Sequence, residues 1–170
     1  MKEPIIVVDQ NDEPLGYAER SSIDYHTQIY RVAALWLVSN NGFVLIAQRM
    51  LTKQKDPGLW GPSVAGTVER DETYEQNIVK ESYEEIGLED VTFHPVKKVF
   101  VKEPRQYFCQ WFIGKTDWTD TANFKLQDDE VEAIAWIKPE DLRKDFEKSP
   151  QKYIPSFSSS LAVLEEAMAV

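Results

Sequence analysis

The chain has 170 residues, of which 42% are hydrophobic, 12% aromatic and 28% charged. This composition is typical of a globular protein, and the length predicts a single domain over residues 1–170. The net charge of −10 argues against binding to a nucleic-acid backbone, which requires a basic surface. A small phosphorylated substrate is compatible with this charge, because a bound metal can mask local negative charge.

The chain holds one cysteine, Cys109, which excludes an intramolecular disulfide and a zinc site made of several cysteines. The apolar run Ile5–Val8 near the N-terminus is too short to be the hydrophobic region of a signal peptide. No apolar run approaches the ~20 residues that a membrane helix requires. We therefore expect a cytoplasmic protein with no membrane association, either a monomer or a homodimer.

Apolar and β-branched runs, separated by turn-forming residues, predict a chain rich in strands. The predicted strands cover residues 5–8, 15–19, 30–39, 43–49, 63–68, 91–101, 107–114 and 131–137. Helices are predicted in the acidic segment that Gly87 closes, over 139–147 with Pro139 at the first position, and over 158–169 with a serine cap. Polar loops are predicted over 50–61 and 115–129. The strands do not alternate regularly with helices, so we expect an α/β protein of the α+β kind, with a mixed sheet, helices on its faces and an N-terminal β-hairpin.

Three glutamates, Glu81, Glu84 and Glu85, are spaced so that they share one face of the acidic helix. Like charges at this spacing destabilise an isolated helix by about 0.2–0.5 kcal/mol per pair. A helix that keeps such a cluster is either solvated there or holds a cation. Mg²⁺ prefers oxygen ligands and is commonly held by carboxylates together with substrate phosphates.

The segment that contains these glutamates, residues 66–88, reads G-x5-E-x7-K-E-S-x-E-E-x-G-L. It resembles the Nudix box, G-x5-E-x7-R-E-U-x-E-E-x-G-U, in which U is a bulky aliphatic residue. Two positions depart from that pattern: Lys80 stands where the family has arginine, and Ser82 stands where it has an aliphatic residue. The resemblance implies the Nudix fold, which is an α/β/α sandwich with a mixed sheet.

The same resemblance implies roles for the residues of the box. The three glutamates, with the backbone carbonyl of Gly66, would bind Mg²⁺ or Mn²⁺. Lys80 would orient Glu81, with a point-like ammonium in place of the planar guanidinium of the family. Glu72 is expected to cap or support the helix and not to bind the metal directly.

Further motifs resemble the branch of this family that contains isopentenyl-diphosphate isomerase and its hydrolase relatives. Gln48-Arg49-x3-Lys53, followed by Asp56-Pro57-Gly58-Leu59-Trp60, resembles the branch motif R-R-x3-K-x3-P-G-x-W. Residues matching Arg49 and Lys53 hold the diphosphate in the isomerases, and a cationic pair can clamp two phosphoryl groups. The alternative is that these two residues are ordinary surface charges. Residues 124–131 and 135–140 carry the same resemblance.

The residues that would perform isomerase chemistry are missing. The catalytic cysteine of the isomerases falls on Ala65, and a metal-binding histidine falls on Thr67. Their Glu-x-Glu pair falls on Arg105 and Tyr107. An alanine can neither protonate an alkene nor abstract an allylic proton. The chain also keeps nearly all of the Nudix box, which is degraded in the isomerases, so the pattern favours a hydrolase.

Aromatic residues are further candidates for substrate contacts. Trp36, Trp60 and Phe108 could stack on a base or line an apolar pocket, although core positions are the simpler interpretation. Cys109 has apolar neighbours on a predicted strand and is expected to be buried.

These observations lead to one hypothesis and two alternatives. The hypothesis is a metal-dependent Nudix hydrolase that cleaves a diphosphate linkage in a nucleoside diphosphate derivative or a related X-P-P compound. The candidate catalytic residues are Lys80, Glu81, Glu84, Glu85 and, as a further ligand or base, Glu130. One alternative is an isopentenyl-diphosphate isomerase. The other is a non-catalytic nucleotide-binding Nudix module, in which Lys80 and Ser82 would reflect relaxed selection.

Overall fold

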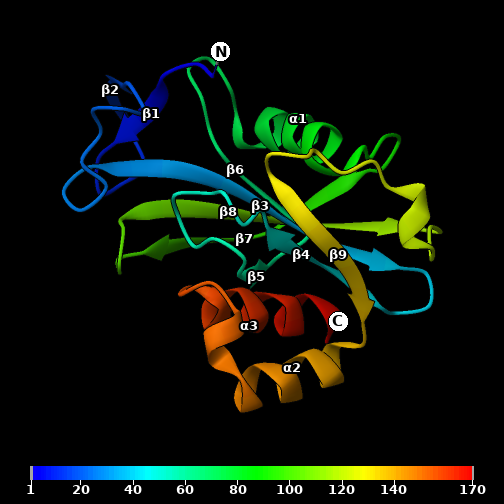
Figure 1. Ribbon diagram of the computed structural model, residues 1–170. Coiled ribbons are helices and arrows are strands. Elements are labelled where there is room, and N and C mark those ends of the chain that lie inside the picture. The colour runs from blue at the N-terminus through cyan, green and yellow to red at the C-terminus, as the bar shows by residue number, and fades with distance from the viewer. Residues whose placement is uncertain (1, 170) are drawn as a thin grey trace.

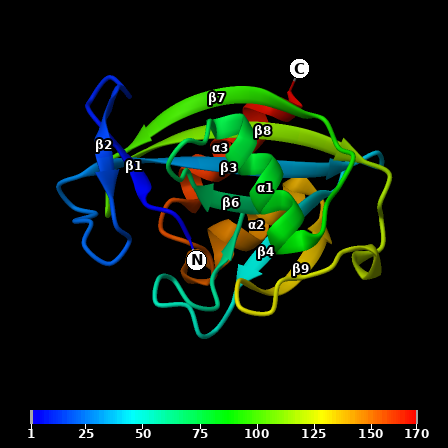
Figure 2. The same cartoon turned by 90° about the horizontal axis from the view of Figure 1, so that it is seen from above.

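A mixed β-sheet forms the middle layer of the molecule in the computed structural model, which describes residues 2–169 (Figure 1). Helix α1 (Tyr74–Ile86) covers one face, and helices α2 (Pro139–Lys148) and α3 (Phe157–Met168) cover the other. Figure 2 shows α1 in front of the sheet and α2 and α3 behind it. The predicted α/β/α sandwich is confirmed. None of the helices within residues 2–169 has the length and apolar character needed to cross a membrane.

The strands lie where the hydrophobic patterns predicted them. Their bounds are β1 (Ile5–Val8), β2 (Pro14–Ala18), β3 (Ile29–Ser39), β4 (Val44–Arg49), β5 (Trp60–Gly61), β6 (Val64–Thr67), β7 (Phe93–Val101), β8 (Tyr107–Thr116) and β9 (Val131–Ile137). Strands β1 and β2 pair antiparallel and form the predicted N-terminal hairpin. The short strand β5 was not predicted: it ends the loop expected over 50–61 and pairs with β4.

Strand β3 is the central strand of this sheet. It pairs antiparallel with β1, β4 and β6, and parallel with β8 along its whole length. Because successive side chains of a strand point to opposite faces, Leu35 and Leu37 lie in the core under α1, while Trp36 lies in the core under α3. The Trp36 indole Nε1–H donates to the carbonyl oxygen of Ser160 in α3 at 2.9 Å. The continuous apolar run of β3 is therefore explained by burial on both faces.

Helix α1 is delimited by local signals at both ends. Thr73 is its N-cap: the Thr73 hydroxyl accepts from the Gln76 N–H, and the Gln76 side chain accepts from the Thr73 N–H. The helix ends at Gly87, whose φ of 66° is the left-handed conformation favoured at this position. The helical periodicity of the acidic segment predicts that Val79 packs on the sheet; this prediction is wrong, because Val79 is 57% exposed. The buried arc of the helix includes Glu81, and this rotation turns Val79 outward.

The other two helices begin close to their predicted starts. Pro139 occupies the first turn of α2, as predicted. The serine cap predicted for α3 is wrong, since the side chain of its N-cap residue, Ser156, makes no capping hydrogen bond. Ser156 has φ −85° and ψ 7°, whereas an N-cap serine usually has an extended backbone.

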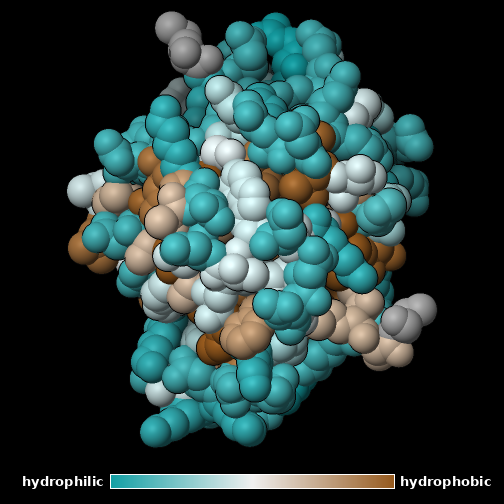
Figure 3. All heavy atoms as spheres, turned by 90° about the vertical axis from the view of Figure 1, so that its right-hand side faces the viewer, coloured by the Kyte–Doolittle hydropathy of each residue, from teal (hydrophilic) through white to brown (hydrophobic). Residues whose placement is uncertain are grey.

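The loop after β8 is anchored to α1, although its sequence is polar. It contains a 3₁₀ turn, Thr121–Asn123, and the buried ring of Phe124. The next backbone N–H groups donate to the C-terminal carbonyls of α1, from Lys125 to Ile86 at 3.1 Å and from Gln127 to Glu85 at 2.9 Å. These bonds satisfy carbonyl groups that a helix end leaves unpaired. The face of the molecule on the side of this loop is covered mainly by hydrophilic residues (Figure 3).

A buried carboxylate ties the N-terminal hairpin to the rest of the molecule. Asp12, at the turn of the hairpin, is 9% exposed. Its carboxylate accepts from Arg31 Nε at 2.7 Å, from Lys98 Nζ at 2.5 Å and from the Tyr74 hydroxyl at 3.0 Å. Burial alone would raise the pKa of Asp12, but the hydrogen bonds from these three side chains lower it below its ordinary value.

Asp12→Ala is expected to destabilise the fold by about 3 kcal/mol at pH 7, because it leaves the largely buried guanidinium of Arg31 without its carboxylate partner. A lowered native pKa stabilises the protein above the unfolded-state pKa of ~3.9, and this contribution is lost as pH falls through the native pKa. Urea unfolding at pH 7 and near pH 3 should therefore show a smaller difference from wild type at the lower pH. Glu3→Ala breaks an exposed pair with Arg70 and serves as the control, with an expected loss of about 0–1 kcal/mol. Equal losses of unfolding free energy in the two variants would contradict the role of Asp12 as a buried ion-pair partner.

Candidate functional site

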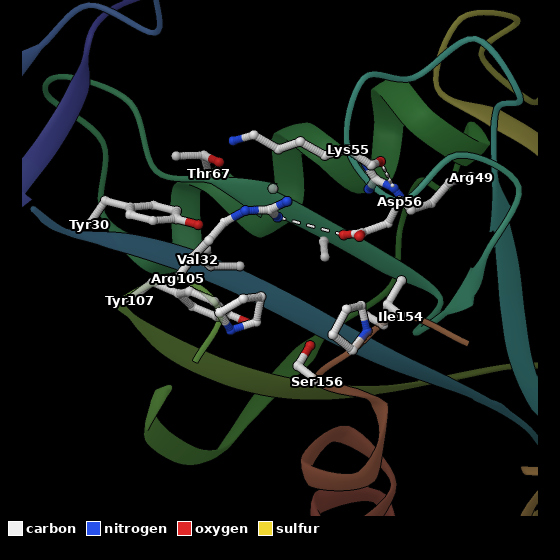
Figure 4. Close-up of a pocket in the computed structure, with 14 residues that line it drawn as sticks. Tyr30, Val32, Arg49, Lys55, Asp56, Thr67, Arg105, Tyr107, Ile154 and Ser156 are labelled. Atoms are coloured by element: carbon white, nitrogen blue, oxygen red, sulfur yellow. Dashed lines mark hydrogen bonds and ion pairs between the residues drawn. The ribbon is translucent and has the colours of Figure 1, made fainter. Parts of the chain in front are cut away.

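Two adjoining hollows open beside strand β6 and form one cleft. They share Arg49, Lys55, Ala65, Gly66 and Thr67. The first hollow, of about 380 Å³, extends to acidic residues of α1 and of the loop before β9. The second hollow, of about 180 Å³, extends to the start of β3 and β8, the β7–β8 turn and the segment before α3 (Figure 4).

Three carboxylates converge in the first hollow: Glu81 and Glu85 from α1, and Glu130 from the anchored loop. Glu81 is 5% exposed and lies directly against Gly66, so that a Cβ added at Gly66 would overlap the Glu81 side chain. Burial raises the pKa of Glu81. Burial and the neighbouring charges of Glu81 and Glu130 raise the pKa of Glu85 well above its ordinary value. The backbone of the loop sets this arrangement, because Gln127 binds the carbonyl of Glu85 and so places Glu130 beside the helix.

Glu84 does not belong to this group. It is exposed on α1 and is not among the residues that line either hollow. The prediction placed Glu81, Glu84 and Glu85 together from their spacing and from the Nudix-box resemblance, but the helix faces the cleft with the side that carries Glu81 and Glu85. Glu130 is the third carboxylate that lines this hollow, and its role as a ligand or base stays a prediction.

The oxygen donors of this group fit a hard divalent cation such as Mg²⁺ or Mn²⁺. The repulsion that raises the pKa of Glu85 is the kind of interaction that a cation would relieve. Within residues 2–169, no three His, Cys, Asp or Glu side chains already stand where they could hold a metal ion. The donor chemistry therefore fits, and the carboxylates would have to close around the ion on binding.

Lys80 contacts other glutamates than the one predicted. Its Nζ lies 2.5 Å from Glu72 and 2.8 Å from Glu69, but 3.8 Å from Glu81. Burial alone would lower the pKa of Lys80, but its hydrogen bonds to Glu69 and Glu72 raise it. Glu72 also accepts from the Glu69 N–H and from the Asn77 side chain, so it supports the start of the helix although Thr73 is the cap. Lys80 thus holds the turn before α1 through its two short ion pairs, and its contact with Glu81 is a longer ion pair.

The two predicted phosphate-binding residues, Arg49 and Lys53, both line the first hollow. Lys53 Nζ is paired with Glu130 at 2.6 Å, and Arg49 Nε donates to the backbone carbonyl of Lys55 at 2.9 Å. Burial would raise the pKa of Glu130, but the ion pairs with Lys53 and Lys2 lower it. The structure brings both predicted cations to the acidic residues, with Lys53 already bound to one of them.

Several residues of the cleft were not predicted from the sequence. The basic ones are Arg20 and Arg105, and the aromatic ones are Tyr25, Tyr30 and Tyr107. Tyr30 and Tyr107 face each other in register at the start of the parallel strands β3 and β8, with ring centroids 5.4 Å apart. No local sequence motif marks these tyrosines, because their pairing depends on the alignment of β3 with β8. The tryptophan considered first, Trp36, is 1% exposed and belongs to the core.

The thiol of the chain lies outside the cleft. Cys109 is buried in the layer between the sheet and α3, as predicted, and burial raises the pKa of its thiol. Ala65, where the isomerases have their catalytic cysteine, lines both hollows. Among the described residues that line these hollows there is neither a cysteine nor a histidine.

Comparison with known proteins agrees with this geometry. A family model described as NUDIX domain matches residues 29–157. The chain is 30% identical to the Nudix hydrolase PA4841 of Pseudomonas aeruginosa over 139 residues, which cover 81% of this chain and 80% of that protein. It is 25% identical to the isopentenyl-diphosphate Delta-isomerase of Salmonella paratyphi B over 162 residues, covering 91% of this chain and 87% of the isomerase.

The fold is also shared with a solved structure. DR0079 from Deinococcus radiodurans superposes with a TM-score of 0.82 at 21% sequence identity, covering 94% of this chain and 98% of that one. The family model, the identity to a Nudix hydrolase and the acidic helix all point the same way. The chain therefore belongs to the Nudix hydrolase family, and the prediction that it is an enzyme of this hydrolase class is confirmed.

Proposed function

We propose that this protein is a divalent-metal-dependent pyrophosphohydrolase that cleaves the diphosphate linkage of a nucleoside diphosphate derivative. The observation that carries the proposal is the distribution of charge along one cleft. Glu81, Glu85 and Glu130 converge at one end, while Arg49 and Lys53 line the space beside them. A diphosphate bound between the two ends would contact the cations directly and the carboxylates through a metal.

The residues of the cleft divide between metal and substrate. Glu81, Glu85 and the Gly66 carbonyl would hold a Mg²⁺ or Mn²⁺, with Glu130 or Glu84 completing the set. When bound, such a cation supplies charge neutralisation at phosphoryl oxygens and activation of water. Arg49 binds and orients the diphosphate, and its planar guanidinium suits two phosphoryl oxygens at once.

The buried carboxylate of Glu81 is the group we assign to proton transfer. Burial raises its pKa, which is the direction that suits a general base. Lys53 neutralises Glu130 at 2.6 Å, so the charge at this end depends on whether a phosphate draws Lys53 away. The tyrosines of the second hollow offer aromatic faces against which a nucleobase can pack (Figure 4).

An isomerase acting on isopentenyl diphosphate is the second candidate, and one observation favours it, the identity to such an isomerase over most of the chain. Against it, Ala65 lines the cleft where a thiol would be needed, and Cys109 is only 3% exposed in a different layer. The hydrolase is therefore the better-supported reading of the cleft.

Mg²⁺ or Mn²⁺ is expected to raise the melting temperature of the wild-type protein relative to EDTA. A ligand specific for the native state stabilises it by about 2.7 kcal/mol at 100 times its Kd. The double variant Glu81→Gln, Glu85→Gln should lose this shift, because it lacks both buried carboxylates. Glu75→Gln, on the exposed first turn of the same helix, should keep it. If neither metal raises the wild-type melting temperature, the metal site is wrong.

The reaction itself is tested by separating and identifying the products chromatographically with Mg²⁺ present, because cleavage of a diphosphate between two organic groups gives two phosphomonoesters and no free phosphate. The substrates are nucleotide sugars, dinucleoside polyphosphates, nucleoside diphosphates and isoprenoid diphosphates. We expect turnover of a nucleoside-containing compound. Conversion of isopentenyl diphosphate to its isomer would instead support the second candidate, and no turnover at all would support a binding module.

A further inference from the structure

Lys55 is a cation held in the cleft without a carboxylate partner. It lies in the loop between β4 and β5 and lines both hollows. Within residues 2–169, no Asp or Glu oxygen comes within the 4.0 Å of an ion pair to its Nζ. The ammonium instead lies 3.1 Å from the ring centroid of Tyr25. Its position is therefore fixed by an aromatic ring, and its charge is left uncompensated.

Arg105 adds a second cation to the same space. It lies in the turn between β7 and β8, and Figure 4 shows its side chain extending beside Lys55 toward Asp56. The Arg105 Nη1 to Asp56 Oδ2 distance is 3.6 Å, too long for a hydrogen bond. Most of the N–H donors of this guanidinium are thus available for another acceptor.

The cations at the junction of the two hollows repel one another. Burial and the charges of Arg105, Arg20 and Arg49 lower the pKa of Lys55 to about 8, and Asp56 only partly offsets this. Arg20 also has a buried Nε with no hydrogen-bond partner among the described residues, although another of its nitrogens binds Glu69. An anion placed between these side chains would satisfy free donors and remove the repulsion.

We propose that Lys55 and Arg105 form a second anion site, here called the Lys55 site, which binds a third phosphoryl group of the substrate. The diphosphate that is cleaved lies on Arg49 and the acidic residues. This inference rests on the proposed function and narrows it: the preferred substrate carries three phosphoryl groups. The third group either extends the phosphate chain or is a monoester elsewhere on the molecule.

The charge of the Lys55 site favours a phosphoryl group over a carboxylate. A phosphomonoester carries about −1.5 to −2 charges at pH 7, close to the two positive charges of Lys55 and Arg105. A carboxylate carries one charge and would repeat what Asp56 already supplies beside Arg105. Guanidinium and ammonium donors together also match the several oxygens of one phosphoryl group.

Two pairs of ligands that differ by one phosphoryl group test the inference. ADP and ATP differ by an extension of the chain, and dephospho-coenzyme A and coenzyme A differ by a distant monoester. Kd is measured by calorimetry in EDTA, and KM is measured with Mg²⁺ wherever turnover occurs. In the wild type, the third phosphoryl group should strengthen binding by about tenfold in at least one pair, the value of one or two charged hydrogen bonds. The pair that shows this gain identifies the source of the group.

Variants then assign the gain to these side chains. Lys55→Met and Arg105→Gln should each reduce the gain to less than about threefold, while Kd for the two-phosphate ligand changes little. Lys144→Met, which removes an exposed lysine of α2 outside the cleft, should keep the full gain. Variants that weaken both members of a pair equally would overturn the inference, because these residues would then hold the cleaved diphosphate itself.

The inference and the proposed function fail in different ways. If the two-phosphate ligands bind and the third phosphoryl group adds nothing in the wild type, only the Lys55 site is wrong. If no ligand of either pair binds and no diphosphate is hydrolysed with Mg²⁺, the proposed function is wrong and the inference falls with it.

Discussion

Glu81→Gln is expected to lower kcat by about 10²–10⁴-fold with the fold intact, the range typical of a general acid–base group. The substitution keeps the shape of a side chain that is 5% exposed and packed against Gly66, but removes its charge and its basicity. The measurement is kcat on the best substrate, with Mg²⁺ saturating in both proteins and melting curves to confirm folding.

Glu75→Gln is the matched control, because it makes the same change on the exposed first turn of the same helix, outside the cleft. We expect its kcat to fall much less than that of Glu81→Gln. If Glu81→Gln retains more than about a third of the wild-type kcat, far above the range for such a group, the assignment of Glu81 is wrong. Glu130 would then be the next residue to test as the base.

Gly66→Ala is expected to reduce kcat by about 100-fold, the cost of misplacing a catalytic group by roughly 1 Å. The added methyl would overlap the Cγ and Cδ atoms of Glu81, and so would push that carboxylate out of the cleft. The backbone of Gly66 has no left-handed φ, so the effect comes from the methyl group and not from backbone strain. Steady-state kinetics and metal titration by calorimetry should both show the loss.

Gly61→Ala is the control for this substitution. Gly61 is buried in the neighbouring strand β5, and its added methyl would meet Ile154 at 3.4 Å, an ordinary contact. We expect it to keep kcat near the wild-type value. Wild-type kcat in Gly66→Ala would mean that Glu81 can work from another position, and would contradict the close contact as a requirement for activity.

The sequence predicted most of the fold because the patterns were local and long. Strand β3 was predicted from a continuous apolar run, and its burial in the cores on both faces of the sheet explains that run. Helix α1 was predicted from its acidic motif and from Gly87 at its end. The outward turn of Val79 could not be predicted, because Val79 lies only about 20° from the buried Ile86 on a helical wheel of 100° per residue. The packing of the whole helix against the sheet decides which of two positions so close on the wheel is buried.

The site was predicted in part, and the missing part is carried by contacts between distant segments. Glu130 comes to Glu85 through backbone hydrogen bonds from Lys125 and Gln127, and such bonds leave no side-chain signature in the sequence. Arg105 reaches Lys55 from a turn far along the chain, so the charge of Arg105 did not stand out before the fold was known.

The central position of β3 has a consequence for synthesis of the chain on the ribosome. One of its neighbours, β1, is made before β3, and two others, β4 and β6, follow soon after it. Its longest partner, β8, ends at Thr116 and is therefore made much later. The helix that covers Trp36, α3, is made last, near the C-terminus. Until β8 has left the ribosome, the edge of the eleven-residue apolar strand β3 that pairs with β8 is uncovered. Such edges pair readily with other chains, so the nascent protein is most prone to aggregation when roughly two thirds of it has been made.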